Sequence, residues 1–384
     1  IGWLPLGGYV KIAGMIDESM DREQMKKPPQ PWEFRSKKAW QRLIIMLGGV
    51  TVNFLLGFFL YGMVLFVWGE SYMPSKNIVH GIYVDSLGME LGLQDGDKIL
   101  AIDDKPFDKF SDGLVKQAII FNDAKVIKVE RANKVIEIPI DPVFIGKLTA
   151  HENKNERLFG PRYPFIIESV TKDSKYPAKE AGLQAGDQII AVNNTPTPYY
   201  HLYEKIAIKN KGKAIDLSVL RQADTLKIPI ILTPEGLMGV RPKLPEMEKE
   251  KYAFIPAMIA GTKKGWNFLT DQITAFGHMF KGKIKASESL GGFGSIGRMF
   301  GNYWDWERFW KMTAILSLIL AFMNLLPIPA LDGGHVMFLV YEVVSGRKPS
   351  DRFMEIATIA GFVIVMGLVI FANGMDFVRW WKGG

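Results

Sequence analysis

The sequence contains no cysteine and only five histidines among its 384 residues. The absence of cysteine excludes disulfides, cysteine-based metal sites and cysteine nucleophiles. The histidines do not form His-Glu-x-x-His, the spacing that places two zinc ligands and a glutamate on one helix face. The chain also lacks helix-turn-helix, zinc-finger and aromatic RNA-binding signatures, and its basic residues are spread along its length. We therefore expect no nucleic-acid partner. The net charge of +7 is instead expected to favour binding to anionic membrane lipid.

Long apolar runs are present beside abundant charge. Hydrophobic residues make up 48% of the chain and charged residues 23%, a mixture that favours a protein divided between membrane and water. No charged residue occurs from Leu43 to Trp68, a run long enough to cross about 30 Å of hydrocarbon. A later apolar run is interrupted by Pro327 and Pro329 before it resumes. The sequence predicts transmembrane helices at 43–69, 309–345 and 353–375.

Basic residues set the expected orientation of these helices. Arg35, Lys37, Lys38 and Arg42 precede the first helix, and Glu70 follows it. Because basic residues flank the cytoplasmic ends of membrane helices, residues 1–42 are expected to form a cytoplasmic loop or β segment. The long insert that follows is then expected outside the cytoplasm.

That insert contains an internal repeat. Gly-Leu-Gln-Asp-Gly-Asp-Lys-Ile, which begins at Gly92, recurs as Gly-Leu-Gln-Ala-Gly-Asp-Gln-Ile from Gly182, an offset of 90 residues. Alternating apolar residues follow each copy and predict half-buried strands, including a hairpin over 126–138. The repeat therefore predicts two similar β-rich modules.

The motif Gly-Leu-x-x-Gly-Asp-x-Ile resembles the circularly permuted PDZ domains of bacterial membrane and periplasmic proteases. The resemblance implies one such domain at 77–142, a linker at 143–162 and a second domain at 163–240. PDZ domains bind extended peptides, often free C-termini, along a sheet edge. The alternative is that the strands proposed for this edge are ordinary core strands. The predicted peptide-binding residues are Gly81, Ile82, Tyr83, Phe165, Ile166 and Ile167.

The segment 250–308 is amphipathic, with aromatic and basic residues interleaved. It is predicted either to lie on the membrane surface or to pack against the two modules.

A polar motif interrupts the third apolar region, where Asn-Leu-Leu-Pro-Ile-Pro-Ala-Leu-Asp-Gly-Gly-His extends from Asn324 to His335. Two prolines end a helix here, and two glycines are expected to relax the backbone after Asp332. An ionisable side chain in apolar sequence usually has a function, because burying its charge is costly. We therefore expect Asp332 to lie in irregular backbone that lines a polar cavity. A plain turn between two hydrophobic helices would also use these residue types.

This motif resembles the second signature of the site-2 proteases, the intramembrane zinc metalloproteases of family M50. The resemblance implies that Asp332 is a Zn²⁺ ligand, with two histidines and a general-base glutamate expected upstream of Ile1. It further implies substrate-binding roles for Asn324, Pro327, Pro329, Gly7 and Gly8, although Asn324 is alternatively a helix-terminus cap. No catalytic residue is expected within the chain itself, which alone is expected to be inactive.

Taken with this resemblance, the sequence indicates a multi-pass α-helical membrane protein with two inserted, β-rich, circularly permuted PDZ domains. The implied function is regulated intramembrane proteolysis in the bacterial inner membrane, with the PDZ domains on the extracytoplasmic side. Implied partners are transmembrane protein substrates such as anti-sigma factors or signal-peptide remnants, peptide C-termini and membrane lipid. The alternative is a membrane-anchored PDZ scaffold without catalytic activity.

Overall fold

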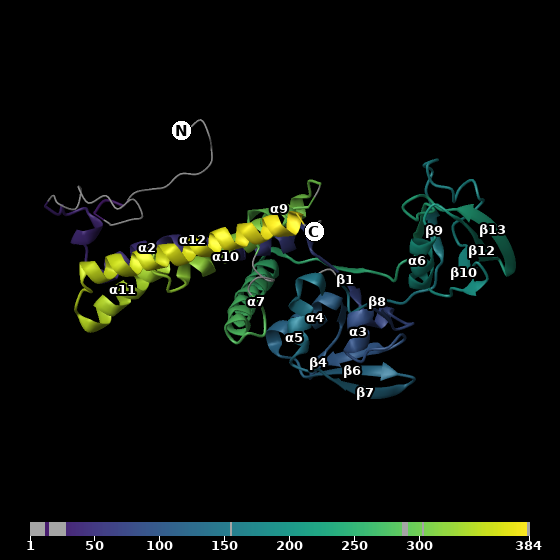
Figure 1. Cartoon of the computed structure of the whole chain (residues 1–384), viewed down its shortest axis with the longest axis horizontal. Helices are drawn as coiled ribbons and strands as arrows, with labels where there is room; N and C mark the ends of the chain where they lie inside the picture. Colours follow the sequence, from purple (N-terminus) through teal and green to yellow (C-terminus); the bar gives the residue numbers. More distant parts are fainter. Residues whose placement is uncertain (1–11, 15–27, 154–155, 286–290, 302, 382–384) are drawn as a thin grey trace. The chain divides into compact units, whose positions relative to one another are not determined.

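The computed structural model describes residues 12–14, 28–153, 156–285, 291–301 and 303–381. Contacts between Cα atoms divide the chain into two units. The helical unit comprises residues up to 69, 251–273 and 289 onwards, and the modular unit comprises 70–250 and 274–288. The ribbon is shown in Figure 1.

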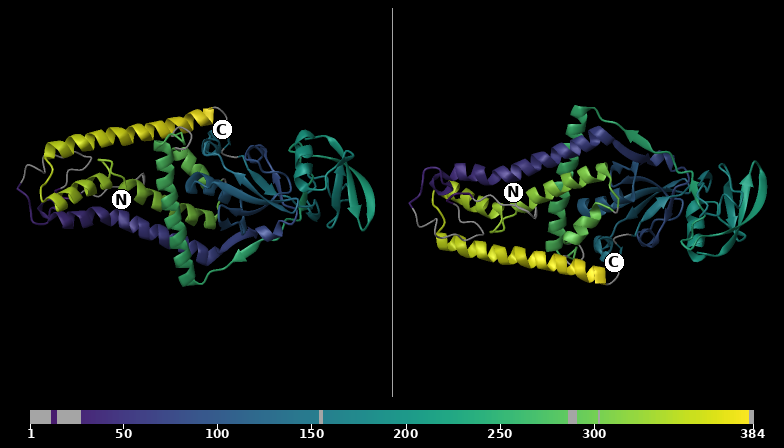
Figure 2. Two further views of the ribbon diagram at one scale, coloured as in Figure 1. Left: turned by 90° about the horizontal axis from the view of Figure 1, so that it is seen from below. Right: turned by 90° about the horizontal axis from the view of Figure 1, so that it is seen from above.

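Four long helices build most of the helical unit (Figure 1). They are α2 (Ala39–Trp68), α10 (Trp306–Leu325), α11 (Asp332–Ser345) and α12 (Asp351–Trp381), with the short η1 (Phe34–Ser36) and α9 (Phe293–Met299) beside them. Figure 2 shows α10 and α11 running between α2 and α12. Among the described residues, three helices are long and apolar enough to cross a membrane, namely α2, α10 and residues 352–381 of α12. The predicted span 309–345 is therefore two helices, because the prolines end α10 at Leu325.

Close packing joins α2 to α10. The Ser317 hydroxyl donates to the Asn53 carbonyl over 2.8 Å. A Cβ added to Gly57 would lie 2.6 Å from the Leu318 side chain, so α2 and α10 approach each other closely at this glycine. Such small-residue contacts are typical of helices that associate within a membrane.

α9 is held against α12 by polar contacts. The Asp376 carboxylate accepts from the Ser295 amide over 2.7 Å and from the Ser295 hydroxyl over 2.5 Å. The Asn373 side chain accepts from the Phe293 amide over 3.1 Å. These bonds satisfy donors at the first turn of α9 that have no partner within the helix.

The modular unit confirms the predicted repeat. We name residues 75–162 the first module and 163–243 the second module. Each has an antiparallel four-stranded sheet of the same topology, β4-β3-β6-β7 in the first module and β11-β10-β12-β13 in the second. Each also has a separate pair of strands, β2-β8 and β9-β14.

The first module alternates short strands with short helices. Its elements are η2 (Ser75–Asn77), β2 (Ile82–Val84), α3 (Ser86–Glu90), β3 (Lys98–Ile102), β4 (Lys105–Pro106), β5 (Lys109–Phe110), α4 (Asp112–Asn122), β6 (Val126–Arg131), β7 (Lys134–Pro139), α5 (Phe144–Thr149), η3 (His151–Asn153) and β8 (Phe159–Pro161).

The second module repeats most of this order. Its elements are β9 (Ile167–Val170), β10 (Gln188–Val192), β11 (Thr195–Pro196), α6 (Tyr200–Lys209), β12 (Ala214–Arg221), β13 (Asp224–Ile231) and β14 (Val240–Pro242). The predicted hairpin over 126–138 is β6 and β7, and β12 and β13 form its counterpart. Even the irregularity in pairing recurs, after Ile99 in the first module and after Ile189 in the second.

A buried ion pair closes each sheet. Asp97 is 0% exposed and accepts from the Arg131 guanidinium over 2.7 and 2.8 Å. Asp187 is 1% exposed and accepts from Arg221 over 2.6 and 2.7 Å. Two parallel bonds from one guanidinium are the strong form of this contact. The recurring Gly-Asp turn is therefore tied to the end of the following hairpin in both modules.

The predicted linker at 143–162 instead completes the first module. Phe144, Ile145 and Leu148 of α5 are buried in its core, as are Leu158 and Phe159. The polar residues around 151–157 separate these apolar positions in the sequence, so their common burial depends on tertiary contacts.

The amphipathic segment 250–308 contributes to both units. α7 (Phe254–Phe280) starts in the helical unit, where Gly261 approaches Gly62 so closely that an added Cβ would overlap the Gly62 backbone. Its last turns belong to the modular unit, where Ile284 enters the core of the first module. Lys283 donates to the Asp123 carboxylate over 3.2 Å. The chain therefore returns to the first module after leaving the second.

A small three-stranded sheet lies where the chain enters and leaves the two modules. It is formed by β15 (Glu248–Glu250), β1 (Glu70–Pro74) and β5. Lys109 reaches the carboxylates of Glu70 at 3.1 Å and Glu250 at 3.3 Å, so one ammonium group joins all three strands.

Candidate functional sites

The helix break at 324–335 is the first candidate site. α10 ends at Leu325 and α11 begins at Asp332, with Pro327 and Pro329 between them. The Leu331 amide donates to the Ile328 carbonyl over 2.8 Å, which forms a tight turn before α11. The break itself is as predicted, because proline removes a backbone donor and blocks the preceding helical turn.

Asp332 occupies the first position of α11, whereas the sequence suggested irregular backbone at this residue. The Asn324 side-chain amide donates to the Asp332 carboxylate over 3.4 Å. Carboxylates are favoured at this end of a helix because its free amide groups carry partial positive charge. The structure therefore brings together two polar side chains of the motif and directs Asn324 at Asp332.

The glycines of the motif serve close packing. Gly333 and Gly334 lie within α11 and neither has a positive φ. A Cβ on Gly333 would overlap the Leu326 carbonyl oxygen, and one on Gly334 would lie 2.5 Å from Pro329. On α12, Gly361 is equally restricted, because its Cβ would overlap the Pro329 carbonyl oxygen. The break is thus pressed against both α11 and α12 through positions without side chains.

α11 is also anchored at its far end. The Arg42 guanidinium of α2 contacts the Glu342 carboxylate at 2.5 Å, and both side chains are largely buried. A desolvated pair of this kind has well-defined geometry, because neither charge can leave its partner without cost. The pair fixes α11 against α2, and hence the direction from which Asp332 is presented.

The predicted ligands of the metal can be placed only in part. Among the described residues, no three His, Cys, Asp or Glu side chains lie close enough together to hold a metal ion. Zinc sites in enzymes use three protein ligands, so the described residues contain the predicted ligand Asp332 but no complete centre. Gly7 and Gly8, predicted to contact substrate, lie outside the described residues.

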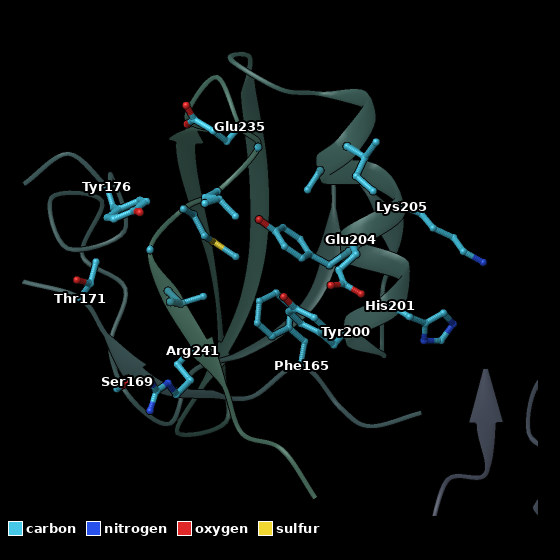
Figure 3. Close-up of a pocket in the computed structure, with 18 of the residues that line it drawn as sticks. Phe165, Ser169, Thr171, Tyr176, Tyr200, His201, Glu204, Lys205, Glu235 and Arg241 are labelled. Carbon is cyan, nitrogen blue, oxygen red and sulfur yellow. The ribbon is translucent and has the colours of Figure 1, made fainter. Parts of the chain in front are cut away.

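A cavity in the second module is the second candidate site. It has a volume of about 800 Å³ and is lined mainly by α6, β14 and the loop 235–239, with Tyr83 and Asp85 of the first module also on its wall. Figure 3 shows Tyr200 and Glu204 projecting from α6 towards β14, while His201 and Lys205 point away. Apolar side chains line its interior, among them Phe165, Ala207, Ile208, Leu237 and Met238.

The strand beside this cavity has a free edge. β14 pairs with β9 on one side, and no described strand pairs with its other side. The amides of Met238 and Gly239, which lead into β14, have no acceptor in the described part of the chain. Gly236 has φ +89° and Gly239 φ +87°, the left-handed region in which glycine is least strained. The loop before β14 therefore presents two backbone amides that have no acceptor among the described residues. Its left-handed turns occur at glycines.

Burial changes the acidity of the side chains in the cavity. Burial raises the pKa of the Glu204 carboxyl, and a hydrogen bond from Tyr200 only partly opposes this. Burial and the neighbouring Glu204 charge raise the pKa of the Tyr200 phenol to about 12. Tyr200 is therefore a neutral hydrogen-bond donor at physiological pH.

The predicted peptide-binding strands are already paired. Ile82 exchanges hydrogen bonds with the turn at 96–97, and β2 pairs along its other edge with β8. In the second module, Ile167 bonds in the same way to the turn at 186–187, and β9 pairs with β14. Neither strand has a free edge for a peptide, although the buried ring of Phe165 does line the cavity. The sequence analysis did not single out β14, the described strand with an unpaired edge, which follows the Gly-Leu-Met-Gly loop at 236–239.

Known proteins resemble the chain over nearly its whole length. The model of peptidase family M50 matches residues 1–368. The regulator of sigma E protease of Haemophilus influenzae is 26% identical over 99% of the chain and 86% of its own length. The regulator of sigma-E protease RseP of Escherichia coli is 27% identical with the same coverage. A putative zinc metalloprotease of Neisseria meningitidis is 25% identical over 98% of the chain and 86% of its own length.

Proposed function

The chain belongs to peptidase family M50, and from this premise we propose that it is an intramembrane zinc endopeptidase that cuts membrane-spanning segments of other proteins. The observation that carries the proposal is the Asp332 carboxylate at a helix break between apolar helices, hydrogen-bonded by Asn324. A carboxylate in such surroundings is costly to bury, and such residues generally mark functional sites. Broken backbone at membrane depth is tolerated where it lines a protein-enclosed or wet cavity.

We assign Asp332 as one zinc ligand, with the remaining ligands outside the described residues. Bound zinc would lower the pKa of a coordinated water and polarise the scissile carbonyl. Asn324 is assigned the task of orienting Asp332, since its amide donates to that carboxylate. Hydrogen bonds to ligating carboxylates commonly fix their direction. Pro327 and Pro329 leave carbonyl groups at the break without helical partners, and these can bind an unwound substrate.

The two modules are proposed to be PDZ-like peptide-binding domains. The free edge of β14 and the unpaired amides of Met238 and Gly239 support binding of an extended peptide that ends in a free carboxylate. Substrates would then be single-span membrane proteins, such as anti-sigma factors or signal-peptide remnants, that an earlier cut has left with a new C-terminus. We propose the bacterial inner membrane as the location, with the modules outside the cytoplasm.

Asp332→Asn in the full-length protein tests the assignment. Zinc content after purification and cleavage of a model transmembrane substrate are both expected to fall at least 10-fold, because the neutral amide is a poor zinc ligand. Glu307→Gln is the control, since it removes an exposed carboxylate from the first turn of α10, away from the helix break, and it should keep its zinc. Full zinc content and activity in Asp332→Asn would exclude Asp332 as a ligand. Absence of zinc and cleavage from the unmodified protein would favour the scaffold alternative.

A further inference from the structure

Aromatic side chains gather where α10 begins. Phe309 lies at the centre of this group, with its ring centroid 5.1 Å from that of Trp304, 6.0 Å from Trp306 and 5.2 Å from Trp310. Trp304 and Trp306 are both exposed. Large rings that lie exposed beside one another generally mark a surface that meets a partner or a membrane.

The position of this group within the helical unit favours the membrane. α10 begins at Trp306 and is long and apolar enough to cross a membrane. The end of α12, another candidate span, carries the exposed Trp380 and Trp381. α9, which precedes the aromatic group in the chain, is bonded to that end of α12 through Asp376. Because tryptophan gathers where membrane helices meet the lipid headgroups, the start of α10 and the end of α12 belong at one headgroup layer.

A small cavity lies within the aromatic group. Its volume is about 230 Å³. The lining residues are Phe300, Gly301, Tyr303, Trp304, Asp305 and Phe309. The faces of aromatic rings attract ammonium groups, and a neighbouring carboxylate such as that of Asp305 adds to the attraction. The wall of the cavity therefore favours a cation that is bound beside apolar surface.

An arginine lies next to two residues of this wall. The Arg308 guanidinium is 5.2 Å from the centre of the Tyr303 ring. Gly301 has φ +81°, and a Cβ added there would overlap Arg308 Nη1, so the glycine leaves room for the guanidinium. In the described part of the chain no carboxylate forms an ion pair with Arg308, and Asp305 accepts from its backbone amide over 2.9 Å. A guanidinium presents a fork of donors that matches a phosphate group.

We propose that this cavity binds the headgroup of a zwitterionic phospholipid whose headgroup carries an ammonium group. The ammonium group lies among the rings beside Asp305, and the phosphate is bound by Arg308. An anionic headgroup would meet the Asp305 charge without compensating it, and an apolar helix would leave both charged side chains unused. The bound headgroup holds the start of α10 at a fixed depth in the bilayer. This site does not depend on the proposed protease activity.

Competition between two lipids tests the proposal. Full-length protein is reconstituted in vesicles of equal parts dioleoyl phosphatidylethanolamine and dioleoyl phosphatidylglycerol and then extracted in mild detergent. Native mass spectrometry counts the lipids that the protein retains. The two lipids share their acyl chains and phosphate and differ in the ammonium group, so phosphatidylethanolamine should be retained in about fivefold excess. Equal retention of the two lipids, or an excess of phosphatidylglycerol, would overturn the proposal.

Substitutions at Trp304 test the role of the rings. Trp304→Leu removes one aromatic face but keeps an apolar side chain, so the two lipids should be retained equally. Trp304→Tyr restores an aromatic face and should restore most of the preference, which separates the effect from misfolding. Trp266→Leu is the matched control, because Trp266 is 62% exposed against 65% for Trp304 and does not line the cavity. An undiminished preference in Trp304→Leu, or a lost one in Trp266→Leu, would refute this assignment.

Arg308→Gln tests the phosphate contact. The change should lower retention of both lipids about fivefold, because both present a phosphate to the guanidinium. Lys311→Gln removes an exposed cation from the same helix, away from the cavity, and should alter neither. Unchanged retention in Arg308→Gln would refute the phosphate contact. Pairing of two chains through the aromatic group in place of lipid would refute the whole proposal.

Discussion

The two modules of the insert share a backbone plan and differ in how their helices meet their last strands. Sheet order, the irregularity in pairing and the buried Asp–Arg pair are the same in both. In the first module the Asp112 carboxylate of α4 accepts from the Leu158 amide, whereas in the second a cavity lies beside α6 and β14. Features that close the fold are therefore repeated, whereas features that would meet a ligand have diverged.

The shared ion pairs provide the strongest test of this comparison. Asp97→Asn and Asp187→Asn each leave a guanidinium without its charged partner beside a buried position. We expect each change to lower the free energy of unfolding of its own module by about 3 kcal/mol, because the remaining group is no longer compensated. Hydrogen exchange of strands β6 and β12 in the full chain measures the two losses separately.

Asp104→Asn is the control for this pair of changes. The Asp104 side chain is fully exposed and lies 3.9 Å from Lys128, so its loss should cost under about 0.5 kcal/mol. If only one of the two buried aspartates proves sensitive, the modules do not share the same means of closing the sheet.

A glycine present in only one module gives the next largest effect. Gly81 has φ +71°, and its added Cβ would overlap the Gly96 carbonyl group. Ile166 stands at the equivalent place in the second module, where the following Ile167 bonds to Asp187 as Ile82 bonds to Asp97. Gly81→Ala should destabilise the first module by about 2 kcal/mol through strain and overlap. Thermal or denaturant unfolding followed by exchange in β3 measures it.

Gly182→Ala separates backbone strain from overlap in this prediction. Gly182 has φ +79°, but no atom lies within 4 Å of its added Cβ. Its cost should be about 1 kcal/mol, from the left-handed conformation alone. Equal costs at the two positions would show that the close approach to Gly96 does not matter.

Asp187 should make the stability of the second module fall at acidic pH. Burial by itself would raise the pKa of Asp187, but the Arg221 guanidinium and the Gln184 amide outweigh it and hold the pKa below its ordinary value. A lowered pKa means that the stabilisation is complete above pH about 4 and is lost as the pH falls through the folded-state value. Exchange in β12 measured from pH 5 downwards should show this loss. In Asp187→Asn the slope should be shallower, and an unchanged slope would assign the loss to other carboxyl groups.

Local signals explain what the sequence predicted correctly. The Gly-Asp turns, the alternating strands and the two prolines act within a few residues, so the repeat, the hairpins and the helix break follow from the sequence. The residues of the cavity are brought together from α6 and from a loop beginning at Glu235, and no local pattern links them. The predicted linker failed for the same reason, because the burial of Phe144 and Phe159 is a tertiary property.

The helix break shows the same limit within a single motif. Asp332 and the prolines could be singled out because charge and proline are unusual in apolar sequence. The role of Gly334 could not, because it depends on the close approach of Pro329 to α11. The pairing of Asn324 with Asp332 likewise depends on how the chain turns between two helices.

A surface ion pair present in only the first module should give the smallest difference in stability between the modules. Lys128 of β6 faces Glu137 of β7, with their charges 3.3 Å apart, whereas the same places in β12 and β13 hold Ser218 and Lys227. Cross-strand opposite charges contribute modestly because both remain in water and are screened by salt. Glu137→Gln should therefore cost under about 0.5 kcal/mol at low salt, and nothing measurable at about 1 M salt. Urea unfolding of the full chain at both salt concentrations, followed by exchange in β6, measures the difference. A larger, salt-independent loss would mean that Glu137 stabilises the first module by packing, and that the sheets differ in more than surface charge.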